Sequence, residues 1–159
     1  MTDYGKLLRT LADARVDFIV VGGFAATVHG SARFTQDVDV VYSRSSENLQ
    51  RIVAALKPLK PYLRGAPDGL PFDWSSATLK AGLNFTLTTS AGALDLLGEI
   101  TGGGTYDNLL MHSSSTMLFD REISVLALPW LIRVKRAAGR PKDLEAIAEL
   151  EVLLEERGD

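Results

Sequence analysis

The sequence contains no cysteine and only two histidines, His29 and His112. Disulfide bonds, zinc sites with thiolate ligands, cysteine nucleophiles and histidine-rich metal sites are therefore excluded. Any metal ion bound by this protein must be held by oxygen ligands, which favours magnesium, manganese or calcium. A GxxxxGK[ST] motif is also missing, and this excludes a P-loop as the nucleotide-binding element.

Long apolar runs are missing as well. No run is long enough to span a bilayer, and residues 1–15 mix charges with apolar positions and lack the apolar core of a signal peptide. We therefore expect a cytoplasmic protein that makes no membrane contact. The 17 basic and 20 acidic side chains give a net charge of −3. This balance argues against a surface that binds nucleic acid throughout, but not against a local basic groove.

The length of 159 residues and the 46% content of hydrophobic residues predict one domain with a substantial core. We expect this domain to cover residues 1–159, with a helical C-terminal part at about 129–157. Strands are expected over 18–21, 37–42, 85–88, 93–97 and 125–128. Helices are expected over 3–15, 24–29, about 46–57, 129–138 and from residue 141 onward. Prolines and glycines punctuate residues 61–80, which predicts a long irregular loop.

Two aspartates, Asp37 and Asp39, share one predicted strand. Side chains alternate along a strand, so these two carboxylates point to the same side. Carboxylates held this close repel each other unless a cation or a shared proton relieves them. A solvated edge strand or a calcium loop is the alternative. The apolar Val38, Val40 and Val41 favour a strand, and no EF-hand spacing follows. We therefore predict that Asp37 and Asp39 are metal ligands.

A glycine pair, Gly22 and Gly23, ends the preceding apolar strand. A glycine turn that opens a helix presents backbone N–H groups to an anion. Taken alone, such a pair is also common in ordinary strand-to-helix turns. Beside two metal-binding carboxylates the pair indicates a phosphate-binding turn, because metal-assisted phosphoryl transfer needs an anion site next to the metal ligands.

The order of these motifs resembles the DNA polymerase β-type nucleotidyltransferase superfamily, in which an apolar strand and Gly-Gly or Gly-Ser precede an Asp-x-Asp strand. More narrowly, the chain resembles small bacterial nucleotidyltransferases that include AbiEii-like toxins of toxin–antitoxin systems. The matching segments lie between about residues 17 and 150. They are Gly-Gly-Phe-Ala-Ala-x-x-His-Gly at 22–30, Arg-x-Thr-x-Asp-x-Asp at 33–39, and Lys-x-Ala-Ala-Gly-Arg-Pro-Lys-Asp at 135–143.

The resemblance implies an α/β (α+β) nucleotidyltransferase fold, with a mixed β-sheet flanked by helices. It also implies metal-dependent transfer of a nucleoside monophosphate from a nucleoside triphosphate (NTP) to a hydroxyl group, with Mg²⁺ or Mn²⁺ as the metal. The acceptor stays open between tRNA, a protein and a small molecule, and a cognate antitoxin is an expected partner if the protein is a toxin. The alternative function is a nucleotide-binding module that has weak or no catalysis and acts through a partner.

A third carboxylate on a neighbouring strand is part of the resembling superfamily, where it is the proposed base for the attacking hydroxyl. Asp95 is the matching position, and Glu99 is the competing candidate. Leu94 and Leu96 flank Asp95, and an ionised carboxylate in an apolar strand is costly unless something compensates it. The alternative is a strand-edge aspartate near a turn. We predict that Asp37, Asp39 and Asp95 are both catalytic and metal-binding.

Nucleotide binding is predicted for both glycines of the turn and for five further side chains, Arg33, Thr35, Lys135, Arg140 and Lys142. Arg33 has a fork of donors suited to phosphate, although steadying the loop explains it equally well. Cations near a helix C-terminus also have a plain explanation in the helix dipole. Lys135 lies four residues after Leu131 on the apolar face, so it is the best candidate to reach a triphosphate. In the resembling superfamily many members have serine where this chain has Gly23, which leaves backbone donors only.

Overall fold

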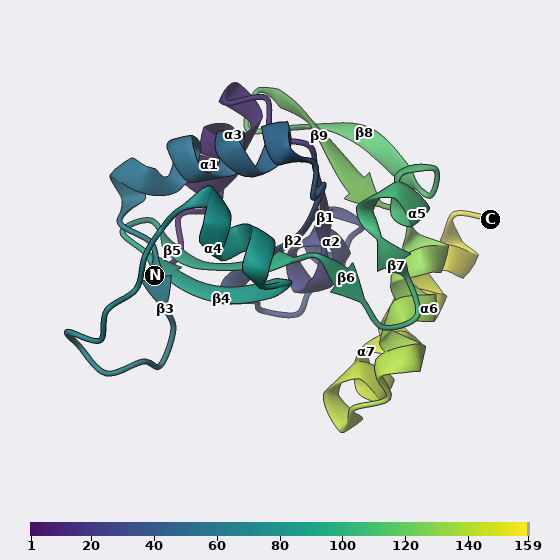
Figure 1. The fold of residues 1–159 in the computed structure, drawn as a ribbon. Helices are drawn as coiled ribbons and strands as arrows, with labels where there is room; N and C mark the ends of the chain where they lie inside the picture. The colour runs from purple at the N-terminus through teal and green to yellow at the C-terminus, as the bar shows by residue number, and fades with distance from the viewer. Residues whose placement is uncertain (159) are drawn as a thin grey trace.

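A mixed seven-stranded sheet forms the centre of the computed structural model, which describes residues 1–158 (Figure 1). The strand order is β3-β4-β5-β2-β1-β9-β8. The strands are β1 (Phe18–Val21), β2 (Asp37–Tyr42), β3 (Tyr62–Leu63), β4 (Asn84–Thr89), β5 (Gly92–Leu97), β8 (Ser113–Leu118) and β9 (Arg121–Leu126). A separate ribbon pairs β6 (Glu99–Ile100) with β7 (Gly104–Thr105). The expected mixed sheet flanked by helices is confirmed.

The helices fall into two groups around this sheet. They are α1 (Tyr4–Asp13), α2 (Gly22–Val28), α3 (Ser46–Leu56), α4 (Ser76–Ala81), α5 (Tyr106–Leu110), α6 (Leu128–Ala138) and α7 (Pro141–Glu156), with a 3₁₀ turn, η1, at Lys57–Leu59. Figure 1 shows α1, α3 and α4 gathered on one side, while α6 and α7 lie together near the C-terminus. Within residues 1–158, no helix is long and apolar enough to cross a membrane.

The helix boundaries follow from local chemistry. The side chain of Asp3 accepts from the Lys6 N–H at 3.0 Å, and that of Ser45 accepts from the Asn48 N–H at 3.2 Å, so both helices start at capping residues. Gly139 has a φ of +66° and ends α6 in the left-handed conformation that glycine tolerates best.

Strand β2 holds the central place in the sheet. It pairs antiparallel with β1 and parallel with β5. Asp39 therefore lies opposite Val21 on one side and opposite Asp95 on the other. Val38 and Val40 are fully buried in the core, whereas the two aspartates of β2 alternate with them and are half-buried. This alternation places the carboxylates on one face of the sheet and the apolar side chains on the other.

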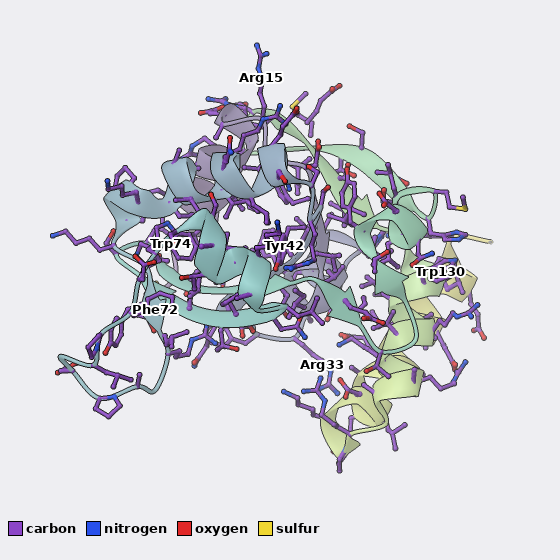
Figure 2. All side chains as sticks on the ribbon, viewed as in Figure 1. Arg15, Arg33, Tyr42, Phe72, Trp74 and Trp130 are labelled. Carbon is purple, nitrogen blue, oxygen red and sulfur yellow. The ribbon has the colours of Figure 1, made fainter. Side chains whose placement is uncertain are left out.

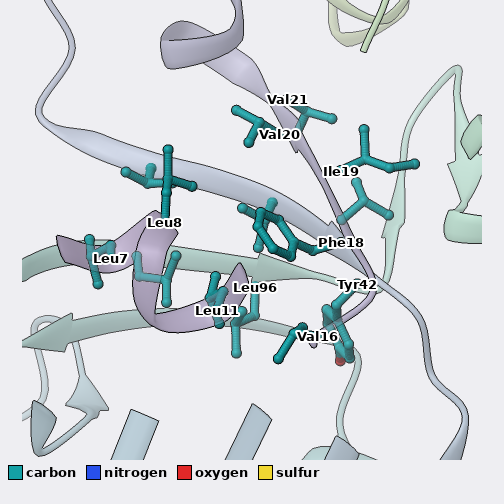
Figure 3. Close-up of a cluster of buried hydrophobic side chains, with 14 of the residues drawn as sticks. Leu7, Leu8, Leu11, Val16, Phe18, Ile19, Val20, Val21, Tyr42 and Leu96 are labelled. Carbon is teal, nitrogen blue, oxygen red and sulfur yellow. The ribbon is translucent and has the colours of Figure 1, made fainter. Parts of the chain in front are cut away.

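The main core lies between this sheet and the helices that cover it. Leu7, Leu8 and Leu11 of α1 are fully buried, and they belong to the same cluster as Phe18 of β1 and Leu96 of β5 (Figure 3). Burying a leucine side chain stabilises the fold by about 1.5–3 kcal/mol. Close packing on the opposite face of the sheet thus fixes the strands that carry the aspartates.

Several boundaries differ from the sequence-based expectation. Residues 61–80 contain β3 and α4 as well as a loop, and Trp74 anchors the segment by donating from Nε1 to the Val53 carbonyl at 3.0 Å (Figure 2). The strand expected at 125–128 is instead β9, and α6 already begins at Leu128. Strand β8 was not expected, because its polar sequence shows no apolar alternation and pairing with β9 decides its structure. Helix α2 begins at Gly22, two residues earlier than expected.

Candidate active site

Three carboxylates converge on one face of the sheet. Asp37 and Asp39 project from β2, and Asp95 lies beside Asp39 in the parallel register of β5. One carboxylate oxygen from each residue lies within 4.8 Å of the others. Glu99 is exposed on β6 and is not part of this group. Of the two candidates for the third carboxylate, the structure therefore places Asp95 next to the pair on β2.

The electrostatics of this cluster call for a positive charge. Burial raises the pKa of Asp39 to about 8, and the negative charges of Asp37 and Asp95 add to this effect, while Lys135 opposes it. The Oδ1 atom of Asp39 is buried and has no hydrogen-bond partner within residues 1–158. Three oxygen ligands with an unsatisfied buried oxygen fit a hard divalent cation such as Mg²⁺ or Mn²⁺.

We predict that the metal-free protein loses stability as the pH rises from about 4 to about 8. Folded Asp39 keeps its proton up to about pH 8, whereas the unfolded chain releases it near pH 4. Stability from this group is therefore complete below about pH 4, declines between about pH 4 and about pH 8 by at most about 1.4 kcal/mol per pH unit, and is lost above about pH 8. Thermal melting in EDTA should show this slope for the wild type and a flatter curve for Asp39→Asn. Parallel curves for the two proteins would contradict the prediction.

The glycine turn brings backbone directly against these carboxylates. Gly22 has a φ of +68°, and a Cβ added there would lie 2.1 Å from Oδ2 of Asp39. No other residue fits this position without both backbone strain and a collision. A Cβ added at Gly23 would lie 2.9 Å from the Thr35 hydroxyl, which itself lies 3.3 Å from Oδ1 of Asp37. The Thr35 hydroxyl thus fills the space next to position 23.

All ten residues predicted from the sequence to form the site line one cavity of about 310 Å³. They are Gly22, Gly23, Arg33, Thr35, Asp37, Asp39, Asp95, Lys135, Arg140 and Lys142. The cavity therefore combines a carboxylate cluster on the sheet with basic side chains from the loop before β2 and from the junction of α6 and α7. Such a combination suits a metal-bound polyphosphate. The individual roles of these residues stay predictions.

The basic side chains differ in how firmly they are held. Lys135 is half-buried, and burial lowers the pKa of its ammonium group, although the nearby Asp143 opposes this. By contrast, Arg136 lies on the outer face of α6 and pairs with Glu151 of α7. Helical periodicity thus placed Lys135 on the cavity side of α6. Arg33 has its Nε 3.8 Å from Glu149 Oε1, so it both lines the cavity and ties its loop to α7.

Asp143 was not selected from the sequence as a site residue. Its carboxylate is almost fully buried and accepts from Arg140 Nε at 2.5 Å and Nη2 at 3.1 Å. It also lies 4.0 Å from Lys135 Nζ. The Arg140 guanidinium contributes to a lowered pKa of Asp143, against the effect of burial. Its position directly after Lys142 in a basic stretch was the available signal, since a lone acid among cations is a natural partner for them.

Arg64 was missed as well. It follows β3 in the stretch expected to be an irregular loop. Its Nη2 lies 2.8 Å from Asp95 Oδ1, and its Nη1 lies 3.8 Å from Asp37 Oδ2. A cation from outside the sequence motifs therefore contacts two of the three carboxylates. No sequence pattern indicated it, because the contact depends on the pairing of a two-residue strand.

A second cavity of about 310 Å³ adjoins the first. Both are lined by the same five residues, Gly22, Asp39, Lys135, Arg140 and Asp143. Its other walls are mostly apolar. They comprise Val21, Leu97, Ile100, Leu131, Val134 and Ala138, with Asn84, Glu99 and Thr101 as polar members. The site thus has a charged chamber and an apolar chamber that meet at Asp39.

Comparison with solved structures identifies proteins of the same architecture. The lincosamide antibiotic adenylyltransferase LnuA, solved with lincomycin bound, is similar with a TM-score of 0.62 and 17% identity, covering 96% of this chain and 98% of that one. ANT(2″)-Ia, solved in complex with adenylyl-2″-tobramycin, has a TM-score of 0.53 and 14% identity, covering 93% and 90%. The chain has the nucleotidyltransferase fold.

A third similar structure comes from Thermotoga maritima, and its assignment as a nucleotidyltransferase is provisional. It has a TM-score of 0.58 and 15% identity, covering 94% of each chain. No protein-family model matches the sequence, and no curated protein matches it. The expected nucleotidyltransferase fold is confirmed over nearly the whole chain, whereas the narrower resemblance to AbiEii-like toxins stays a prediction.

Proposed function

We propose that this protein is a metal-dependent nucleotidyltransferase that transfers a nucleoside monophosphate from an NTP to a hydroxyl group. The observation that carries the proposal is the convergence of Asp37, Asp39 and Asp95 in a cavity that also holds four basic side chains. The nucleotidyltransferase fold of the chain supports it. In this proposal the three aspartates hold Mg²⁺ or Mn²⁺. When bound, the metal favours the deprotonated acceptor hydroxyl and neutralises charge on the leaving group.

The residues of the chain supply the rest of the reaction. Lys135, Arg140 and Lys142 bind the triphosphate, together with Arg33 and the glycine turn. Asp95 accepts the proton of the acceptor hydroxyl. The hydroxyl oxygen then forms a bond to the α-phosphorus, the bond from that phosphorus to the bridging oxygen breaks, and pyrophosphate leaves. The basic side chains balance the charge that develops on the departing pyrophosphate.

For the acceptor we propose a small molecule that carries a hydroxyl group. The apolar chamber of about 310 Å³ beside Asp39 has the dimensions and the mostly apolar walls of a small-molecule pocket. The bound molecules named for two similar structures, lincomycin and adenylyl-2″-tobramycin, are also small. Labelled transfer to tRNA or to a protein instead would overturn this part of the proposal. A toxin role with a cognate antitoxin is the remaining prediction, which the genomic neighbour and co-expression would test.

We predict that metal and nucleotide binding depend on the two aspartates of β2. Calorimetry with Mn²⁺ and a non-hydrolysable NTP should give clear binding for the wild type and little or none for the Asp37→Asn/Asp39→Asn protein, since two of the three ligands lose their charge. Asp13→Asn/Asp107→Asn, which changes two aspartates outside the cavities described above, is the matched control and should bind like the wild type. Equal binding by all three proteins would rule out this metal site. Clear binding without transfer to any acceptor would favour the nucleotide-binding module.

A further inference from the structure

The guanidinium group of Arg64 occupies the carboxylate cluster itself. It lies against Asp95 at 2.8 Å and Asp37 at 3.8 Å, the two carboxylates that flank the cluster on β5 and at the start of β2. Asp39 is served by a different cation, since the positive charge of Lys135 acts on it. Arg64 therefore compensates the part of the cluster that Lys135 does not.

The geometry of this guanidinium is that of a counter-ion and not of a fully hydrogen-bonded partner. Nη2 donates to the Leu87 carbonyl at 2.6 Å, while Oδ1 of Asp95 has no hydrogen bond in the described part of the chain. The Nε of Arg64 is buried and has no hydrogen-bond partner there either. An incompletely satisfied buried donor is costly. The ionic attraction between the guanidinium and the two carboxylates offsets this cost.

A divalent ion and this guanidinium compete for the same oxygens. Metal–oxygen distances for Mg²⁺ are about 2.0–2.1 Å, so an ion ligated by both Asp37 and Asp95 would lie within a few ångströms of the guanidinium nitrogens. Positive charges at that separation repel strongly in a partly buried site. A doubly charged ion also satisfies carboxylates better than a single guanidinium charge that makes no aligned hydrogen bond to them.

The Arg64 side chain borders solvent. It is 31% exposed, and Arg64 comes directly after β3 in the sequence, where the loop between β3 and α4 begins. Figure 1 shows this loop projecting from the body. Gly65 follows with a φ of +82°, and a Cβ added there would meet no atom within 4 Å. The space beside Gly65 is thus open, and a withdrawing guanidinium gives up its 2.6 Å hydrogen bond to the Leu87 carbonyl as well as both ion pairs.

We propose that Arg64 is a built-in counter-cation of the carboxylate cluster, which pairs with Asp37 and Asp95 when no metal is bound and must withdraw before a divalent ion can bridge them. This inference rests on the proposed metal-dependent function and concerns its regulation. Arg64 keeps the metal-free site stable and lowers its affinity for metal. Metal binding and Arg64 pairing are then mutually exclusive, so the arginine sets the metal concentration at which the site is occupied.

The test compares Arg64→Gln with Arg51→Gln in the full chain stripped with EDTA. Arg51 is a matched control, because its side chain on α3 is partly exposed, like that of Arg64, and also pairs with a carboxylate, its Nη2 lying 3.7 Å from Glu47 Oε2. Calorimetry with Mn²⁺ alone should show roughly tenfold tighter binding for Arg64→Gln than for the wild type. Thermal melting without metal should show a lower transition for Arg64→Gln. Arg51→Gln should match the wild type in both measurements.

The opposite signs of these two effects separate a counter-cation from a merely structural arginine, whose loss would lower both stability and metal affinity. Equal or weaker Mn²⁺ binding by Arg64→Gln overturns the inference but leaves the proposed metal site intact if the wild type binds. Absence of binding by both proteins at millimolar Mn²⁺ overturns the metal site and the inference together.

A second measurement on the wild type does not depend on the variant folding. The buried Nε–H of Arg64 should give a slowly exchanging nitrogen–proton NMR signal in EDTA. On titration with Mg²⁺ alone, this signal should shift and exchange rapidly with solvent over the same concentration range as binding. A signal that stays unchanged at saturating Mg²⁺ would show that Arg64 does not withdraw, and would overturn the inference.

Discussion

Asp95→Asn should abolish nucleotidyl transfer while the protein still folds and binds NTP. A general base acts on the transition state more than on the bound substrate, so turnover should fall by roughly 100-fold or more, with a much smaller change in nucleotide affinity. Asparagine keeps the shape of the side chain and removes both the base and a charged metal ligand. The measurement is a labelled-nucleotide transfer assay combined with calorimetry using a non-hydrolysable NTP.

Glu99→Gln provides the matched control for this experiment. Glu99 lines the apolar chamber but stands outside the carboxylate cluster. Its loss should therefore leave the turnover far closer to the wild-type value than the loss of Asp95 does. Full activity in Asp95→Asn together with an inactive Glu99→Gln protein would transfer the role of base to Glu99. Because Asp95 also pairs with Arg64 at 2.8 Å, the metal-free Asp95→Asn protein should melt below the wild type.

Among substitutions that add a single methyl group to the site, Gly22→Ala should cause the largest loss of stability and of metal binding. The added Cβ would lie 2.1 Å from Oδ2 of Asp39 and would sit on backbone with a φ of +68°. Backbone strain alone costs about 1–2 kcal/mol, and the collision must in addition displace either the turn or the carboxylate. We expect a clear fall in melting temperature and a loss of Mn²⁺ binding in the same protein.

Gly69→Ala separates the two causes. Gly69 has a φ of +83°, similar to that of Gly22, but a Cβ added there meets nothing within 4 Å. This variant therefore carries the backbone strain without the collision, and it should lose a little stability and bind Mn²⁺ normally. If both variants bound Mn²⁺ equally well, the close contact between the turn and Asp39 would have no part in shaping the site.

The parts of the site that the sequence predicted are those controlled by local periodicity. Alternation along a strand was enough to place Asp37 and Asp39 on one side of β2, and helical spacing was enough to turn Lys135 toward the cavity and Arg136 away from it. These patterns depend on residues a few positions apart. The prediction that Asp95 is the third carboxylate came from the resemblance to a known superfamily. Local sequence does not determine the register between strands that are distant in the chain.

The parts that the sequence could not predict depend on contacts between distant elements. Arg64 reaches the cluster only because β3 pairs with β4, and a two-residue strand leaves no periodic signal. Asp143 becomes a buried partner of Arg140 and Lys135 only when α7 packs against α6. Strand β8 has a polar sequence, and its structure follows from pairing with β9. In each case tertiary structure outweighs local propensity.

The parallel pairing of β2 with β5 also ties the site to the folding of the whole chain. Asp39 and Asp95 become neighbours only after the segment between them, which includes α3, α4 and the β3–β4 edge, has closed on itself. Contacts of such high contact order form slowly, since the entropy of closing a long loop is lost before the pairing compensates it. A nascent or partly folded chain would therefore hold its carboxylates apart and have no assembled metal site. Divalent ions would bind the folded chain and not the unfolded chain, and would therefore shift the folding equilibrium toward the folded state.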